Sequence, residues 1–208
     1  MNYLAHLYLS DGDPESLIGS LMGDFVKGRV DAGLPASLRR GIRIHRSVDS
    51  FTDAHAVFGR SRRRIRPEFR RYSGILVDLY YDHFLARQWS RYSDVPLEEF
   101  SQAVYRVLQE HQHGFPPSMR RSMSYMVRNR LLQSYRELDG IEHALRGIET
   151  RLKRPSHLHQ AIVDLEENHQ ALAEDFMAFF PDLIRFVRQI DRIDPDTPPA
   201  ESGSGRPD

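Results

Sequence analysis

The chain has 208 residues, of which 40% are hydrophobic, and it carries 29 basic and 29 acidic residues. This length and hydrophobic content suit one domain with a substantial core better than two small domains. The balanced charge gives no general case for a nucleic-acid partner. Because the chain has no cysteine, disulfides, thiol nucleophiles and thiolate metal sites are excluded, and any metal ion must be held by oxygen or imidazole ligands.

Hydrophobic periodicity predicts an all-α fold, because no stretch alternates with period two and no repeat of fixed period occurs. We expect a single-domain helical bundle over residues 1–190 and a disordered tail over residues 191–208, where proline, glycine and serine accumulate. No apolar run approaches the roughly 20 residues that cross a bilayer, and the N-terminal stretch has no basic leader and contains His6. We therefore expect a cytoplasmic protein without membrane association.

The first long helix is predicted over residues 14–28, with Asp13 as its N-cap, proline at its first position and its end near Gly28. Asp24 falls late in this helix, where the macrodipole disfavours a carboxylate. Three explanations stay open for Asp24: it is solvated, it pairs with Lys27, or it binds a cation.

A second helix is predicted over residues 36–52, and its apolar stripe contains two polar residues, His45 and Asp49. Residues four apart lie on one helical face, which is the natural spacing for two metal ligands on one helix. The alternative is an aspartate that only fixes the tautomer of a buried histidine.

The stretch 75–89 predicts a helix that is apolar on almost every side and yet contains Asp78, Asp82 and His83. A helix of this kind is normally buried, and buried carboxylates need a cation, a metal or many hydrogen bonds. Asp78 and Asp82 share one face, whereas His83 is turned about 100° away. The three residues predict a metal site; the alternative is a histidine that donates to a backbone carbonyl and carboxylates that pair with arginine.

Residues 96–111 predict an amphipathic helix that is expected to be scaffold. Residues 141–151 and 158–180 predict two more helices, the latter long and apolar, and Pro181 interrupts or restarts it. Between the first two of these helices, a helix after residues 115–117 carries a methionine stripe that is typical of core packing. The histidines outside the candidate site are expected at the surface: His157, His159 and His169.

A block of seven arginines lies within residues 60–71, with only Glu68 to offset them. Its members are Arg60, Arg62, Arg63, Arg64, Arg66, Arg70 and Arg71. Buried neighbours anchor the block, so the guanidinium groups are displayed and suit an acidic partner or phosphates. The alternative is a solvated surface whose arginines pair with nearby acids.

Five segments in order form one pattern along the chain. They are Met1-Asn2-Tyr3-Leu4-Ala5-His6-Leu7, Gly23-Asp24-Phe25-Val26-Lys27-Gly28, Gly41-Ile42-Arg43-Ile44-His45-Arg46-Ser47-Val48-Asp49, Thr52-Asp53 and Asp82-His83-Phe84-Leu85-Ala86-Arg87-Gln88-Trp89. Together with residues 135–151 and 176–181, this pattern resembles the acyl carrier protein phosphodiesterase family over nearly the full length.

The resemblance implies a helical fold related to the HD phosphohydrolases and a metal-dependent phosphodiesterase. This activity hydrolyses the link between 4′-phosphopantetheine and the serine of holo-acyl carrier protein, which gives apo-acyl carrier protein and 4′-phosphopantetheine. The chain departs from the usual HD order, because its adjacent pair is Asp82-His83. The expected metal ligands are Asp24, His45, Asp49, Asp78, Asp82 and His83. The expected catalytic residues are Asp24, His45, Arg46, Asp49, Asp82 and His83. His6, Lys27 and Arg46 are expected to contact the substrate.

This residue set suits phosphodiester hydrolysis, because carboxylates combined with imidazoles favour Mn²⁺ or Mg²⁺. Arg46 and Lys27 are expected to hold phosphoryl oxygens, although Arg46 has the alternative of pairing with Asp49 or Asp53. The arginine block is the expected docking surface for an acidic carrier protein. Two other functions stay open: an HD-type hydrolase of a nucleotide or another small phosphoester, and a non-catalytic helical adaptor for an acidic or nucleic-acid partner.

Overall fold

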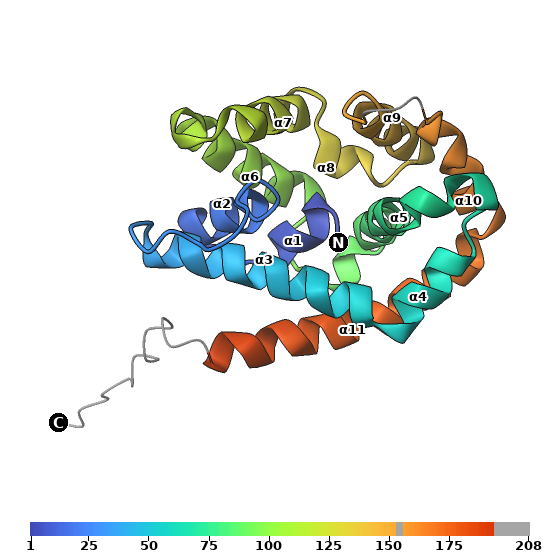
Figure 1. Ribbon diagram of the computed structural model, residues 1–208, viewed down its shortest axis with the longest axis horizontal. Helices are drawn as coiled ribbons and strands as arrows, with labels where there is room; N and C mark the ends of the chain where they lie inside the picture. Colours follow the sequence, from blue (N-terminus) through green and yellow to red (C-terminus); the bar gives the residue numbers. More distant parts are fainter. Residues whose placement is uncertain (153–155, 194–208) are drawn as a thin grey trace.

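The structure is a computed structural model that describes residues 1–152 and 156–193, with side chains through residue 190 (Figure 1). The described residues form helices and turns and contain no β-strand, so the all-α, single-domain prediction is confirmed. The α-helices are α1 Tyr3–Tyr8, α2 Pro14–Met22, α3 Ala36–Ala54, α4 Ala56–Arg63, α5 Ser73–Arg87, α6 Leu97–His111, α7 Pro117–Arg128, α8 Leu131–Ser134, α9 Leu138–Glu149, α10 Ile162–Glu167 and α11 His169–Ile193. The 3₁₀ turns are η1 Pro67–Tyr72, η2 Trp89–Arg91, η3 Gln112–Gly114 and η4 Leu158–Ala161. Kinship with the HD phosphohydrolase fold stays a prediction.

Helix α5 is the central element of the core, as its apolar sequence predicted. It packs against α1, α4, α9 and α11, and most of its side chains are buried. In Figure 1, helices α7, α8 and α9 lie on one side of α1 and α5, whereas α3, α4 and α11 lie on the other. No helix in the part of the chain that the structure describes is long and apolar enough to span a membrane.

Helices α2 and α3 cross closely because both have glycine at the crossing. A Cβ atom on Gly19 would lie 2.3 Å from the carbonyl oxygen of Leu38, and one on Gly41 would lie 2.2 Å from that of Ser16. Real side chains cannot approach a backbone so closely, so the crossing requires glycine at both positions. The crossing fixes α3, which carries His45 and Asp49, against the start of the chain.

The predicted helix over residues 14–28 is confirmed at its start and wrong at its end. The Asp13 carboxylate accepts the Ser16 amide at 3.0 Å, as expected for an N-cap. The helix ends at Met22, whose carbonyl accepts the amides of both Phe25 and Val26, at 2.9 and 3.0 Å. Asp24 therefore lies in the turn beyond the helix and not in its last turn.

The prediction of one helix over residues 158–180 that Pro181 interrupts is also wrong. The segment divides into η4, α10 and α11, and α11 continues through Pro181 to Ile193. Proline removes the hydrogen bond to the carbonyl four residues earlier, but Pro181 is exposed and Met177 is 39% exposed, so water can reach that carbonyl. Residues 194–208, most of the expected disordered tail, lie outside the described residues.

Candidate metal centre

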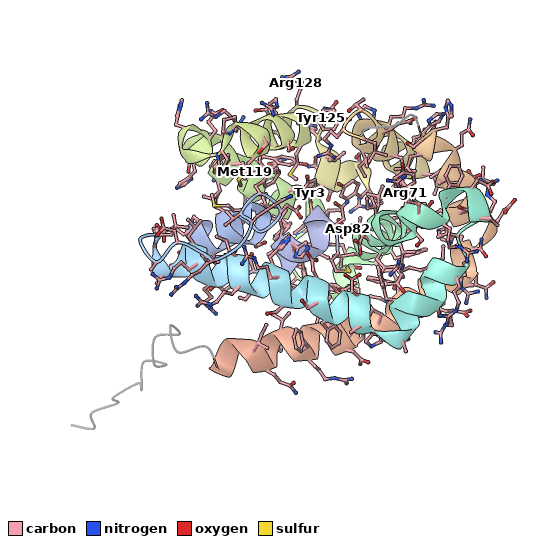
Figure 2. All side chains as sticks on the ribbon, viewed as in Figure 1. Tyr3, Arg71, Asp82, Met119, Tyr125 and Arg128 are labelled. Carbon is pink, nitrogen blue, oxygen red and sulfur yellow. The ribbon has the colours of Figure 1, made fainter. Side chains whose placement is uncertain are left out.

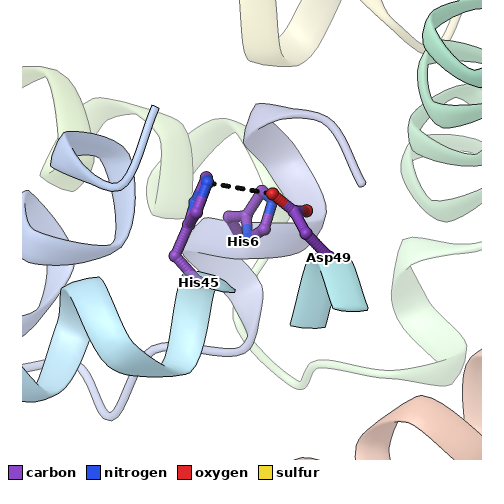
Figure 3. A group of neighbouring side chains, drawn as sticks. All are labelled: His6, His45 and Asp49. Atoms are coloured by element: carbon purple, nitrogen blue, oxygen red, sulfur yellow. Dashed lines mark ion pairs between the residues drawn. The ribbon is translucent and has the colours of Figure 1, made fainter. Parts of the chain in front are cut away.

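His6 from α1 meets His45 and Asp49 from α3 at the centre of the molecule (Figure 3). The Nε2 atom of His6 lies 3.2 Å from Asp49 Oδ1, and the Nε2 atom of His45 lies 3.2 Å from Asp49 Oδ2. The imidazole rings are stacked, with centroids 3.9 Å apart. One ligand atom from each residue lies within 4.8 Å of the others, so these three residues form a possible metal-binding group.

Packing holds the two imidazoles in place. His6 and His45 are each 3% exposed. A Cβ atom on Gly23 would lie 2.3 Å from the His45 ring, so only glycine leaves room for the ring there. His45 Nδ1 has no hydrogen-bond partner among the described residues. Packing therefore orients Nε2 of His45 toward the carboxylates.

Asp24 adds a second carboxylate to the group from the connection between α2 and α3. Its Oδ1 atom lies 3.4 Å from His45 Nε2, and its side chain is 50% exposed. Asp49 is 42% exposed. Both carboxylates therefore face buried imidazoles and still have oxygens open to an incoming group.

His45 carries the positive charge of this group. Burial opposes the protonated form of His45, but hydrogen bonds to Asp24 and Asp49 outweigh burial and raise its pKa to about 9. Burial lowers the pKa of His6 to about 4, although Asp49 acts in the opposite direction. Burial also opposes ionisation of Asp49, but its bonds to His45 and His6 hold its pKa well below the usual range. The carboxylates thus stabilise a positive charge on His45, whereas burial keeps His6 neutral.

The donor spacing and chemistry fit a divalent ion. Two atoms about 2.1 Å from one ion and at right angles to each other are about 3 Å apart. The separations of 3.2 to 3.4 Å between the imidazole nitrogens and the carboxylate oxygens are close to this value. Imidazole nitrogens and carboxylate oxygens both ligate divalent metal ions in proteins.

The structure places Asp82 and His83 outside this group. Asp82 is fully buried and accepts the amides of Leu4 and Ala5, at 2.7 and 3.0 Å. These amides belong to the first turn of α1, which has no partner inside the helix for them. Burial raises the pKa of Asp82 to about 7, although the two amides act against it. Asp82 therefore anchors the helix that carries His6, and the structure does not place it as a ligand.

His83 follows the alternative that the sequence left open. Its Nδ1 atom lies 2.8 Å from the Tyr135 carbonyl, which can only accept, so Nδ1 donates. Its Nε2 atom lies 3.3 Å from Nε2 of His169. His169, which was expected at the surface, is partly exposed, and its ring packs against His83 and Phe84.

Asp78 lies beside the group without touching either imidazole. Its Oδ1 atom is 3.1 Å from the nitrogen of Met1, and the same nitrogen is 3.2 Å from Asp49 Oδ1. Burial raises the pKa of Asp78, and the charge on Met1 acts against that rise. Asp78 is thus connected to Asp49 through Met1.

Arg46 and Lys27 belong to the connection that carries Asp24. The Arg46 guanidinium donates to the carbonyls of Val26 and Gly28, each at 2.7 Å. Arg46 therefore holds this connection in place, and it pairs with neither Asp49 nor Asp53. Lys27 is exposed on the same connection.

Three members of the arginine block are structural. Asp175 of α11, 2% exposed, accepts from Arg60 at 2.6 Å and from Arg64 at 3.2 Å. Arg66 bonds the fully buried Asp164 of α10 at 2.7 Å. These pairs fix α4 and η1 to α10 and α11. Three of the seven arginines are therefore engaged in ion pairs, and docking by the block stays a prediction. The exposed members without an acidic partner in the described chain are Arg62, Arg63, Arg70 and Arg71.

A cavity of about 710 Å³ adjoins the metal group, and sequence analysis missed it. Asp24 lies in its wall, together with Tyr3 of α1 and Tyr125 of α7, which Figure 2 labels. Small residues at helical spacing open the remaining wall: Ser118 and Ser122 on α7, and Ala144 and Gly147 on α9. That spacing was the available signal, but the methionine stripe of α7 had been interpreted as core packing and no role had been assigned to α9.

The fold and the site define an all-α protein with a candidate His-His-Asp centre beside a cavity. A family model described as acyl carrier protein phosphodiesterase matches residues 1–183. The chain belongs to this family.

Relatives named acyl carrier protein phosphodiesterase match almost end to end. One from Klebsiella pneumoniae subsp. pneumoniae is 36% identical over 188 residues, which cover 90% of this chain and 97% of the relative. Relatives from Escherichia coli O6:K15:H31 and Enterobacter sp. are each 35% identical, over 92% and 87% of this chain and 98% and 94% of the relatives. No solved structure gives a significant match.

Proposed function

We propose that this protein hydrolyses the phosphodiester that joins 4′-phosphopantetheine to a serine of holo-acyl carrier protein. The products are apo-acyl carrier protein and 4′-phosphopantetheine. The observation that carries the proposal is the half-open group of His6, His45, Asp49 and Asp24 beside a cavity. Relatives named for this activity, about 35% identical over nine-tenths of the chain, support it.

The residues that would hold a divalent ion are His6, His45 and Asp49, with Asp24 as a further oxygen ligand. Mn²⁺ suits this donor set better than Mg²⁺ because two of the ligands are imidazoles. When bound, such an ion lowers the pKa of a water toward neutrality and offsets charge on the phosphoryl oxygens. Asp82 supports the site indirectly, because it fixes α1 and thereby His6.

In the reaction, the oxygen of a water bonds to phosphorus while the bond from phosphorus to the serine oxygen breaks. One proton of the water is transferred overall to the serine oxygen. Asp24 lines the cavity and is half exposed, so its free oxygen can accept a hydrogen bond from this water and orient it. Arg46 holds the connection that carries Asp24 and so positions this carboxylate.

Intact-mass measurement of holo-acyl carrier protein tests the proposal directly. The protein is stripped of metal, reloaded with Mn²⁺ or Mg²⁺ and incubated with the carrier protein. We expect the carrier protein to lose its phosphopantetheine mass with Mn²⁺, more slowly with Mg²⁺ and not at all with chelator. Hydrolysis of nucleotides without any change of the carrier protein would instead indicate a small-phosphoester hydrolase, and no hydrolysis of either would favour the adaptor.

A further inference from the structure

We infer that the cavity between α1, α7 and α9 binds the pantetheine arm of the substrate. This inference rests on the proposed function and assigns that function a binding site. Its basis is position: Asp24 is within 3.4 Å of His45 Nε2 and also forms part of the cavity wall. A phosphodiester held at the metal group therefore lies at one end of the cavity.

The cavity has a suitable size. Its volume of about 710 Å³ lies inside the range of about 300–1,000 Å³ that is common for small-molecule sites. Another cavity, of about 460 Å³, is lined by residues of η1, η4, α9 and α10 and by none of the candidate ligands. Size and location together favour the cavity beside Asp24.

The lining matches the chemistry of the arm. The pantetheine arm is uncharged and flexible, with two amides, one free hydroxyl, a branched dimethyl carbon and a terminal thiol. Leu131, Ala144 and Ile148 offer apolar contact for the dimethyl group. Ser122, Tyr125 and further polar side chains offer hydrogen bonds for the amides. An arm that lies along α7 and α9 would contact both the apolar and the hydrogen-bonding side chains.

Positive charge lies around the same cavity. Arg121, Arg146 and Arg151 belong to its lining. Arg146 pairs with Glu142, and Arg151 bonds the Gly147 carbonyl. Arg121 is exposed and forms no hydrogen bond or ion pair with any residue the structure describes. This positive charge suits the acidic protein that delivers the uncharged arm to the cavity.

Two serines on α7 provide a matched pair of variants. Ser122 and Ser124 are both partly buried, but Ser122 lines the cavity, whereas Ser124 lines a different hollow with Arg120 and Arg128. Ser122→Trp should fill the cavity, and Ser124→Trp should leave it open. Ser118→Trp fills it from an exposed position and serves if Ser122→Trp does not fold.

The first measurement is kinetic and uses the Mn²⁺-loaded full chain. We expect Ser122→Trp to raise KM for holo-acyl carrier protein at least about tenfold, which corresponds to a loss of about 1.4 kcal/mol of binding free energy. Hydrolysis of bis(p-nitrophenyl) phosphate, which has no arm, should fall by a smaller factor than hydrolysis of the carrier protein. Ser124→Trp should match the wild type on both substrates. Equal KM values for the two folded variants would overturn the inference.

The second measurement separates failure of this inference from failure of the proposed function. Free pantetheine is added to the protein, and its binding is followed by saturation-transfer NMR. We expect binding by the wild type and by Ser124→Trp, and loss of binding in Ser122→Trp or Ser118→Trp. This result would support the binding site even if the carrier protein were not hydrolysed. No binding by the wild type, or equal binding by all variants, would overturn it.

Discussion

Two regions of this molecule hold aspartates beside cationic groups, and the regions differ in how much of each carboxylate is exposed. Asp164 and Asp175, 0% and 2% exposed, are enclosed by arginines and, for Asp175, by the Ser61 hydroxyl. Asp24 and Asp49, 50% and 42% exposed, face the imidazole of His45. The first pair joins helices, whereas the second pair has oxygens free for an incoming group.

The comparison shows that burial of a carboxylate does not by itself indicate a functional site. An arginine keeps its proton, so a carboxylate that it encloses has no further partner to gain. An imidazole can exchange its proton for a metal ion, and a half-open carboxylate can accept another ligand. Remaining coordination capacity therefore distinguishes Asp24 and Asp49 from the enclosed acids.

The largest expected effect is loss of turnover on removal of an open ligand. His45→Ala, Asp49→Asn and Asp24→Asn should each lower kcat at least about 100-fold, because loss of an outer-shell partner alone costs about 10–100-fold. Each variant should also bind less Mn²⁺, which elemental analysis after dialysis would measure. His159→Ala is the control, because its imidazole bonds Glu149 and belongs to no cluster of described ligands. Wild-type metal content and turnover in all three variants would contradict the assignment.

The next largest effect is on stability, and it should differ between variants of Asp82 and of Asp49. Asp82→Ala leaves two buried amides of α1 without an acceptor and should lower the free energy of unfolding by about 2–4 kcal/mol. Asp49→Ala should cost less, because this carboxylate is 42% exposed, so that solvent screens its bonds, and Asp78 remains as a partner of the Met1 nitrogen. Urea denaturation of the metal-free proteins would measure both. Equal losses would remove the distinction between enclosed and open acids.

The sequence predicted α3 well, because a regular amphipathic stripe turned His45 and Asp49 inward and the structure places both there. The sequence placed Asp82 and His83 among the expected ligands, because polar residues in a helix that is apolar on almost every side are typical of a metal site. In the structure Asp82 accepts two backbone amides, and His83 contacts the Tyr135 carbonyl and His169. Contacts with the backbone have no sequence signature. His6 was expected to contact substrate, and its membership of the metal group depends on how Asp82 anchors the short helix α1.

The pH dependence of stability tests the enclosed role of His83. Burial lowers its pKa from 6.5 to about 4, although its bond to the Tyr135 carbonyl acts against the shift. Below pH 6.5 the unfolded chain binds a proton that the folded protein does not accept until about pH 4. The free energy of unfolding should therefore decrease as the pH falls from 6.5 to about 4, by at most about 3.5 kcal/mol at about 1.4 kcal/mol per pKa unit. His83→Asn can keep a donor near the Tyr135 carbonyl and should flatten the decline in urea titrations; an unchanged slope would contradict this origin.

The smallest expected effect concerns the four exposed arginines of the block. Arg62 donates to Ser73 at the start of α5, and Ile75 of the same helix lines the cavity, so this side of the block lies near the arm-binding site. Figure 2 shows Arg71 at the same end of α5. We propose that Arg62, Arg63, Arg70 and Arg71 attract the acidic carrier protein, whereas Arg60, Arg64 and Arg66 are already engaged.

Charge reversal should separate these two groups of arginines. Arg63→Glu combined with Arg70→Glu should raise KM for holo-acyl carrier protein about threefold to tenfold at low salt and less at high salt, because exposed charges act over a Debye length of about 8 Å at physiological salt. Turnover of bis(p-nitrophenyl) phosphate should not change. The same two charges reversed on α7 and just beyond it, in Arg128→Glu with Arg130→Glu, form the matched control. An effect of this second variant alone would move docking to the α7 side of the cavity, and no salt-dependent effect of either would contradict electrostatic docking by these arginines.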